Sequence, residues 1–306
     1  MSIILEAQNV VKRYAGHTAL SGVSIQVPQG SIFGLLGPNG AGKTSLIRII
    51  NQITGPDEGQ IILDGERLQP KHIEVIGYLP EERGLYKKMK VGEQLLYLAQ
   101  LKGMPKAEAV EKLKAWFIKF DIKGWWDKNV EDLSKGMQQK TQFIATIVHE
   151  PKLVILDEPF SGFDPINANL LKDEILALKE KGTTIIFSTH RMESVEELCD
   201  NIALINKSKV VLSGEKKEVK NRFRDNTFNL EYSGALAPIE GVFEILSAKN
   251  VEGITKAKVR LLDGTNANQF LGQAIQQVDL KAFNENIPSF NEIFIKVVGE
   301  DANTIL

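Results

Sequence analysis

Two hydrophobic periodicities alternate along the chain. Apolar runs bounded by polar turns predict strands, and apolar residues three or four apart predict helices. The first predicted domain begins with two strands, 3–11 and 20–27, joined by a polar turn at 15–18. Further strands are predicted at 31–36, 75–79, 153–159, 184–188, 201–206 and 209–214, and helices at 45–53, 90–102, 105–120, 134–149 and 166–181. We expect Trp116, Trp125 and Trp126 to form the core of the helical stretch.

Between the strand at 31–36 and the helix at 45–53 stands the sequence GPNGAGKT, residues 37–44. Its glycines allow backbone N–H groups to converge on clustered negative charge, and a helix amino terminus adds partial positive charge. In such a loop the lysine reaches the β- and γ-phosphates and the threonine hydroxyl ligates Mg²⁺. The pattern therefore predicts a nucleotide phosphate site formed by Gly37, Pro38, Asn39, Gly40, Ala41, Gly42, Lys43, Thr44 and Ser45.

Tyr14 stands ahead of this loop, at the edge of the first strand pair. An exposed aromatic side chain there is suited to stacking on adenine. An ordinary tyrosine at a sheet edge fits the sequence equally well.

Two carboxylates follow the apolar run LVIL at residues 153–156. A buried parallel strand would deliver Asp157 and Glu158 at its carboxyl end, where ligands bind in open α/β sheets. Mg²⁺ between these acids and a triphosphate would remove their repulsion. Asp157 is then expected to hold the metal through water, with Glu158 as the base for the attacking water. His190 follows the next predicted strand and is expected at the same sheet edge.

The amino-acid composition narrows the possible classes of protein but identifies no particular site. Apolar residues make up 43% and charged residues 25% of 306 residues, enough for about two globular domains. The net charge of −2 gives no reason to expect nucleic acid as a partner. A single cysteine, Cys199, is consistent with a reducing compartment, and we expect it to be buried. No run is long and apolar enough to span a bilayer and no signal peptide is seen, so we expect a soluble cytoplasmic chain.

Taken in this order, the motifs resemble those of the ATP-binding subunit of an ABC transporter over roughly the first 215 residues. The specific segment is LSKGMQQK, residues 133–140, between the phosphate loop and the acidic strand. The resemblance implies ATP as ligand and a dimer in which the signature of one subunit closes over the γ-phosphate held by the other. It further implies that Ser134 and Gly136 contact that phosphate, that Asp164 links the two sites, and that His190 contacts the γ-phosphate and water. Ser134 also suits a helix N-cap.

The chain departs from the family pattern at three positions. Lys135 and Met137 replace a glycine and a glutamine of the usual LSGGQ signature, and Glu81 stands where the family has a glutamine that touches Mg²⁺. A third carboxylate would either tighten metal binding or raise the pKa of one carboxyl group. We expect the metal ligands to be Thr44, Glu81 and Asp157.

The fold expected is α/β, a P-loop nucleotide hydrolase domain over 1–218. It carries an antiparallel β subdomain and a helical subdomain at about 87–150. A small α+β accessory domain is expected over 219–306, with strands at 227–232, 242–248 and 257–262 and helices at 266–278 and 289–298. Dimer stabilisation, regulation and permease contact are all open as its role.

The resemblance is strongest to ATPase subunits of bacterial two-component exporters of the sodium-extrusion type. It implies an ATP hydrolase that drives a separate integral-membrane permease and is held through it at the inner face of the cell membrane. The alternative is a soluble ABC-type ATPase acting on ribosomes or nucleic acid, but such proteins usually carry two cassettes or long coiled coils. The transported substrate is not encoded in these motifs.

Overall fold

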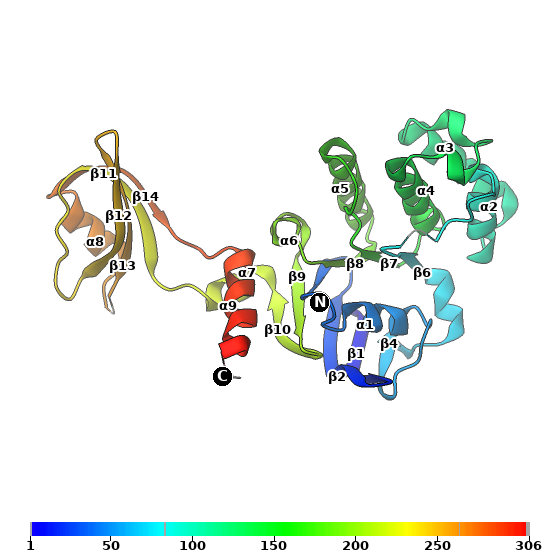
Figure 1. Ribbon diagram of the computed structural model, residues 1–306, viewed down its shortest axis with the longest axis horizontal. Coiled ribbons are helices and arrows are strands. Elements are labelled where there is room, and N and C mark those ends of the chain that lie inside the picture. The colour runs from blue at the N-terminus through cyan, green and yellow to red at the C-terminus, as the bar shows by residue number, and fades with distance from the viewer. Residues whose placement is uncertain (1, 83, 263, 304–306) are drawn as a thin grey trace. The chain divides into compact units, whose positions relative to one another are not determined.

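The computed structural model describes residues 2–82, 84–262 and 264–303. The chain divides into two compact units, residues 1–216 and 217–306 (Figure 1). The sequence-based boundary at residue 218 lies within α7 (Lys216–Arg222).

A six-stranded sheet forms the centre of the first unit, with strand order β10-β9-β3-β8-β7-β6. Strands β9, β3, β8, β7 and β6 run parallel to one another, and only β10, at the edge beside β9, pairs in the antiparallel direction. Near-continuous apolar runs such as LVIL are typical of parallel strands covered on both faces. The strands are β3 (Ile32–Leu36), β6 (Ile76–Leu79), β7 (Leu153–Asp157), β8 (Thr184–Thr189), β9 (Asn201–Asn206) and β10 (Lys209–Glu215).

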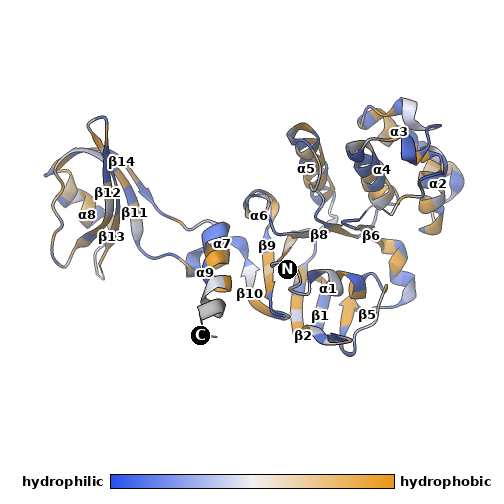
Figure 2. Cartoon of the chain, viewed as in Figure 1, coloured by the Kyte–Doolittle hydropathy of each residue, from blue (hydrophilic) through white to orange (hydrophobic). Residues whose placement is uncertain are grey.

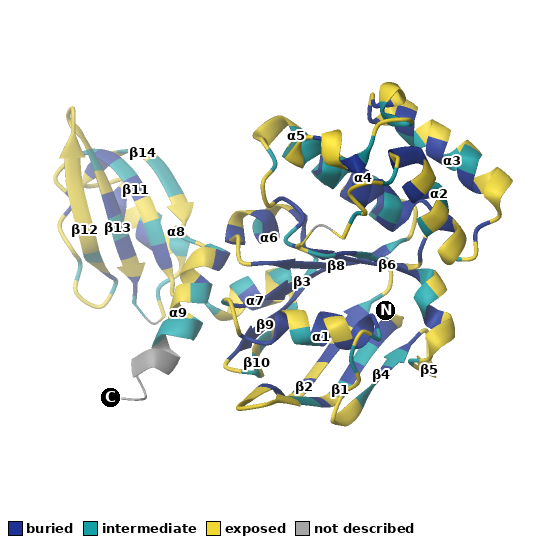
Figure 3. Cartoon of the chain, turned by 45° about the vertical axis from the view of Figure 1, so that its right-hand side comes forward, coloured by how far each residue is buried: buried dark blue, intermediate teal, exposed yellow. Residues whose placement is uncertain are grey.

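A second sheet is antiparallel, with order β2-β1-β4-β5. Its strands are β1 (Ile3–Tyr14), β2 (His17–Pro28), β4 (Glu58–Leu63) and β5 (Glu66–Arg67). Helix α1 (Lys43–Ile50) lies between the two sheets, and one apolar core joins its buried face to both of them (Figure 3). This core fixes the start of α1 against the ends of the parallel strands.

The helical insertion lies between β6 and β7 in sequence and consists of α2 (Val91–Leu101), α3 (Lys106–Lys119) and α4 (Lys135–Ile147). These helices carry both hydrophilic and hydrophobic residues (Figure 2). The expectation for the tryptophans is wrong, since all three are only half-buried. The core is instead filled by Leu113, Phe117, Phe120 and Phe143, and the ring of Trp126 lies where Gly92 leaves room for it. Short 3-10 helices occur at Pro70–Val75, Lys123–Trp125 and Val130–Asp132.

The rest of the first unit contains α5 (Pro165–Glu180) and α6 (Met192–Leu198), the latter not predicted. Cys199 is buried as expected, and its burial raises the pKa of the thiol to about 12. The strands and long helices predicted for this unit are confirmed to within a few residues.

The second unit is an antiparallel sheet of order β12-β13-β11-β14 with helices α7, α8 (Ala267–Ala274) and α9 (Phe290–Asn303). Its strands are β11 (Thr227–Gly234), β12 (Phe243–Val251), β13 (Ile254–Leu261) and β14 (Val278–Glu285). Two predictions here need correction: the helix expected over 266–278 ends at Ala274, and β14 was missed. The buried rings of Phe243 and Phe270 meet edge to face with centroids 4.8 Å apart, so the unit has its own core.

Candidate active site

The site is assembled at the carboxyl ends of four neighbouring parallel strands. The phosphate loop follows β3, His190 follows β8, Glu158 follows β7, and Glu81 lies two residues after β6. Because these strands are parallel and adjacent, their carboxyl ends meet at one edge of the sheet. Segments spread over more than 150 positions of sequence are thereby brought together.

Glycine is required at two points of the phosphate loop. Gly37 and Gly42 have φ angles of 148° and 118°, a region that side chains rarely adopt. A Cβ atom at Gly37 would lie 2.2 Å from the carbonyl oxygen of Ile205, and one at Gly42 would lie 2.3 Å from that of Ala19. The loop is therefore packed directly against the backbone of β9 and β2 and then turns into α1.

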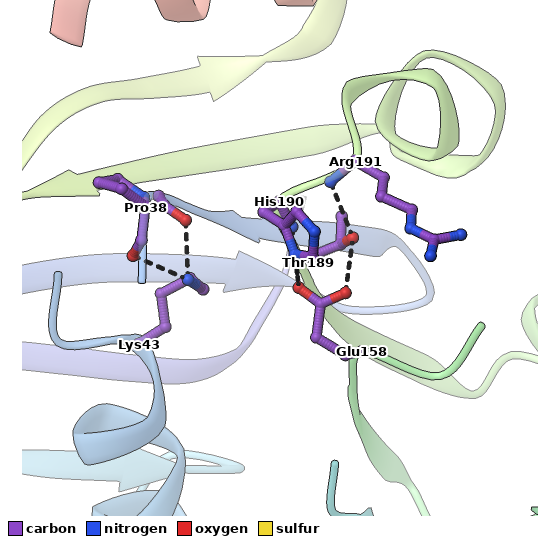
Figure 4. A network of polar contacts seen from close by, with 7 residues as sticks. Pro38, Lys43, Glu158, Thr189, His190 and Arg191 are labelled. Atoms are coloured by element: carbon purple, nitrogen blue, oxygen red, sulfur yellow. Dashed lines mark hydrogen bonds and ion pairs between the residues drawn. The ribbon is translucent and has the colours of Figure 1, made fainter. Parts of the chain in front are cut away.

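The ammonium group of Lys43 donates to two carbonyl oxygens of the loop itself, Gly37 at 2.7 Å and Pro38 at 3.1 Å (Figure 4). The residue is only 7% exposed. Burial lowers the pKa of Lys43, while the negative charges of Glu158, Asp157 and Glu81 oppose that shift. A buried cation is thus held at the loop, facing a cluster of carboxylates.

Glu158 and His190 form a hydrogen-bonded pair (Figure 4). The Oε1 atom of Glu158 accepts from the backbone N–H of His190 at 2.9 Å and lies 2.6 Å from its Nδ1 atom. The Thr189 hydroxyl donates to the other carboxylate oxygen at 3.3 Å. The Glu158 backbone is itself constrained, with a φ of 48° and its N–H bonded to the Ser188 carbonyl. The carboxylate is therefore oriented by several partners on β8 and the residues after it.

A cavity of about 200 Å³ is bordered by Lys43 and Glu158. It is lined by His17, Ala19, Asn39, Gly40, Gly42, Lys43, Thr44, Ser45, Glu81, Asp157 and Glu158. All three expected metal ligands are among them, and their hydroxyl and carboxylate oxygens suit a hard cation such as Mg²⁺. Burial raises the pKa of Asp157, and the nearby charges of Glu81 and Glu158 add to the shift. Among the residues that the structure describes, no three His, Cys, Asp or Glu side chains form a ready metal cluster.

The ring of Tyr14 stacks on that of His17, with centroids 6.0 Å apart and planes inclined by 22°. The two residues face each other across the turn between β1 and β2. Sequence reasoning missed His17, which lines the cavity. In the sequence His17 falls within the turn predicted at 15–18, and no motif marks it.

Eight predicted site residues lie outside the cavity lining: Tyr14, Gly37, Pro38, Ala41, Ser134, Gly136, Asp164 and His190. Ser134 is the N-cap of α4, and its hydroxyl accepts from the Met137 N–H at 3.3 Å. Gly136 has open space around it. Asp164 caps α5, accepting from the N–H groups of Ile166 and Asn167, and these bonds lower the pKa of its carboxyl group.

Comparison with known proteins gives the family. Residues 20–161 match the model "ABC transporter", and residues 214–298 match "ATP-binding protein DrrA1-3-like, C-terminal domain". The chain is 42% identical over 301 residues to the uncharacterized ABC transporter ATP-binding protein YhaQ of Bacillus subtilis (strain 168), covering 97% of this chain and 99% of that protein. It is 32% identical over 222 residues to the ABC transporter ATP-binding protein NatA of the same organism, covering 71% and 90%.

A solved structure of the ATP-binding subunit of an ABC transporter matches with a TM-score of 0.68 and 30% identity, over 72% of this chain and 93% of that one. The fold and the site thus define an ABC-type P-loop ATPase. The chain belongs to the family of ABC transporter ATP-binding proteins, which bind ATP and couple its hydrolysis to transport. No helix in the described residues is long and apolar enough to cross a membrane.

Proposed function

We propose that this chain hydrolyses ATP as a homodimer that drives a separate membrane permease in export. The dimer is supported by the observation that the predicted site residues of one chain do not all line the same cavity. The phosphate loop, Glu81, Asp157 and Glu158 line one cavity, whereas Ser134 and Gly136 of the same chain do not. A second copy would supply these two residues from the N-terminus of its α4, whose backbone N–H groups and partial positive charge suit a phosphate.

In this proposal the chain's own residues hold the triphosphate and the attacking water. Lys43 exchanges the carbonyls of Gly37 and Pro38 for phosphate oxygens, which also compensate its buried charge better. Glu158 orients the water and accepts its proton, and His190 holds the carboxylate in place. Thr44, Glu81 and Asp157 would hold Mg²⁺, which neutralises charge on the phosphates when bound. Tyr14 and His17 would carry the adenine.

Replacement of the proposed base tests both hydrolysis and dimerisation. Glu158→Gln should lower kcat by about 10²–10⁴-fold because the proton acceptor is lost. ATP should still bind, so a dimer should accumulate with ATP in size-exclusion chromatography with light scattering. Lys43→Ala is the control that should lose ATP binding and therefore the dimer. A Glu158→Gln protein that remains monomeric with saturating MgATP would refute the homodimer.

The permease contact is proposed at a groove of about 340 Å³ between the parallel sheet and the helical insertion. The groove adjoins the Glu81 segment and is lined mainly by apolar residues, including Pro80, Leu85 and Leu98. At its margin Ile53 and Leu101 are 61% and 59% exposed. An apolar segment of a membrane partner would cover these side chains and be sensitive to the metal site.

A charge substitution tests this contact. Leu101→Asp should abolish co-purification with the partner permease, while ATP binding is kept. Ile118→Asp on α3 is a matched control, because Ile118 is 60% exposed and lies outside the groove lining. Equal co-purification of the two variants would exclude the groove as the contact. In this proposal the chain is attached to the inner face of the membrane only through that permease.

A further inference from the structure

Helix α4 begins at the signature segment and carries a row of polar side chains along one face. Gln139, Gln142, Thr146 and His149 follow one another at intervals of three, four and three residues, and His149 lies just past the helix end. This spacing places them on one side of the helix. Each contacts a backbone carbonyl outside α4, and we call the four residues the α4 ladder.

The first contact joins the ladder to the segment that carries the proposed base. The Nε2 atom of Gln139 donates to the carbonyl of Ser161, three residues after Glu158. The N–H of Ser161 donates in turn to the carbonyl of Glu158 at 3.0 Å. The Oε1 atom of Gln139 is buried without a hydrogen-bond partner among the described residues. Leaving a polar oxygen buried and unpaired is costly.

The next contacts join the ladder to the Glu81 segment. Gln142 Nε2 donates to the carbonyl of Glu82 at 3.4 Å. The single proton of the Thr146 hydroxyl is shared between two carbonyl acceptors, Gln142 within α4 at 2.9 Å and Tyr78 at 3.3 Å. Backbone packing reinforces this contact, because a Cβ atom at Gly77 would lie 2.3 Å from the Thr146 carbonyl oxygen. The ladder thus holds the backbone on both sides of Glu81.

The last contact holds β6 itself. His149 Nε2 lies 3.3 Å from the carbonyl oxygen of Ile76, and burial lowers the pKa of this imidazole to about 4. Because a carbonyl oxygen only accepts, Nε2 carries the proton in this contact, as in the Nε2–H tautomer of the neutral ring. Backbone carbonyls move with their whole segment, so bonds to them transmit displacement better than contacts between flexible side-chain ends.

We propose that Gln139 and Gln142 are positioning residues that fix the signature residues 134–136 relative to Glu158 and Glu81 of the same chain. This rests on the proposed homodimer. There, Glu158 and Glu81 serve the ATP of their own chain, whereas the signature serves the ATP of the partner. The α4 ladder therefore couples the two ATP sites, so that closure of one site positions the signature of the other.

The test compares ladder variants with a helix-internal control. Gln139→Leu and Gln142→Leu remove one donor each at similar volume. Thr141→Val is the control, because its hydroxyl donates at 3.0 Å to the Met137 carbonyl within α4 rather than to either segment. For each variant we would measure kcat, the ATP concentration at half-maximal rate, the Hill coefficient, ATP affinity at low protein concentration, and Tm.

Both ladder variants should lose about three- to tenfold in kcat, as expected for loss of one hydrogen bond, with the Hill coefficient falling to one. ATP affinity should stay within about twofold of wild type, because the phosphate loop is unchanged. Thr141→Val should behave as wild type. A wild-type Hill coefficient and kcat in both glutamine variants, or an equal loss in Thr141→Val, would overturn the proposal.

A second pair of variants covers the Tyr78 contact if Gln142→Leu does not fold. Thr146→Val removes the hydroxyl, whereas Thr146→Ser keeps it and should restore cooperativity. Failure of serine to restore what valine loses would contradict a role for the hydrogen bond. A wild-type protein that hydrolyses ATP without cooperativity and stays monomeric would refute the homodimer itself. A cooperative wild type with unaffected ladder variants would refute only the ladder.

Discussion

The Nδ1 atom of His190 lies 2.6 Å from Oε1 of Glu158, and the backbone N–H of His190 donates to that same oxygen. One carboxylate oxygen is thus held twice by a single residue that follows the neighbouring strand. The second oxygen accepts from Thr189, which leaves the carboxylate fixed in orientation at the mouth of the phosphate cavity.

Replacement of the histidine should lower turnover without weakening nucleotide binding. In His190→Ala the backbone donor survives but the ring contact is lost, so Glu158 is less well oriented. We expect kcat to fall by about 10²-fold or more, with ATP affinity nearly unchanged. Steady-state ATPase assays and equilibrium ATP titration measure the two quantities. Loss of ATP affinity to the same extent as kcat would contradict an orienting role.

A methyl group on the phosphate loop should be poorly tolerated. Gly42→Ala would place Cβ 2.3 Å from the Ala19 carbonyl oxygen at a φ of 118°. Relief requires displacement of the loop or of β2, so we expect loss of ATP binding and a destabilisation of about 2 kcal/mol or more. Gly55→Ala is the control, since nothing lies within 4 Å of a Cβ atom there. Urea unfolding and ATP titration check the result.

Glu81 should set the metal requirement of the site. Glu81→Gln removes one of the three carboxylates that line the cavity, so the Mg²⁺ concentration for half-maximal ATPase activity should rise by about threefold or more. Glu82→Gln changes the adjacent residue, which does not line the cavity, and should leave the requirement unaltered. The measurement is a Mg²⁺ titration of ATPase activity with the permease present. An unchanged titration in Glu81→Gln would remove Glu81 from the metal site.

His149 should make the first unit sensitive to acid. Burial first, then the nearby charge of Lys102, lowers its pKa from 6.5 to about 4 in the folded chain. The unfolded chain therefore binds more protons between these values. The stability contribution is complete above pH 6.5 and decreases as pH falls toward 4, by up to about 3 kcal/mol.

The His149 effect can be isolated by a difference measurement. His149→Gln keeps a hydrogen-bond donor but does not titrate, so its unfolding free energy should depend less on pH than that of wild type. Urea unfolding at pH 7.5, 6.0 and 5.0 gives the slope of unfolding free energy against pH for the variant and for the wild type. Identical slopes in the two proteins would show that His149 is not the group responsible.

Much of the first unit could be predicted because its strands are apolar runs and its helices have clear periodicity. The site at the strand ends also followed from sequence, since Asp157 and Glu158 directly follow such a run. Strand β14 was missed for a physical reason: a register irregularity between Glu231 and Tyr232 places Leu280 and Phe283 on the same face. An odd interval between two core residues breaks the period of two.

The tryptophans and His17 show a different limit. Trp116, Trp125 and Trp126 are hydrophobic, but their large rings remain half-buried while smaller phenylalanines fill the core. His17 had no motif of its own and gains its place only because the turn after β1 brings it beside Tyr14 and the loop. Contacts made by pairing and packing are not encoded in local pattern.

In the sequence, the helical insertion lies between β6 and β7, two strands that are neighbours in the sheet. Ile76 on β6 pairs with Leu153 on β7, in parallel, and the insertion leaves after β6 and returns before β7. Both covalent attachments therefore lie on adjacent strands. Because the two strands are parallel, the insertion leaves at the carboxyl end of β6 and returns at the amino end of β7, so it is anchored at both ends of this strand pair.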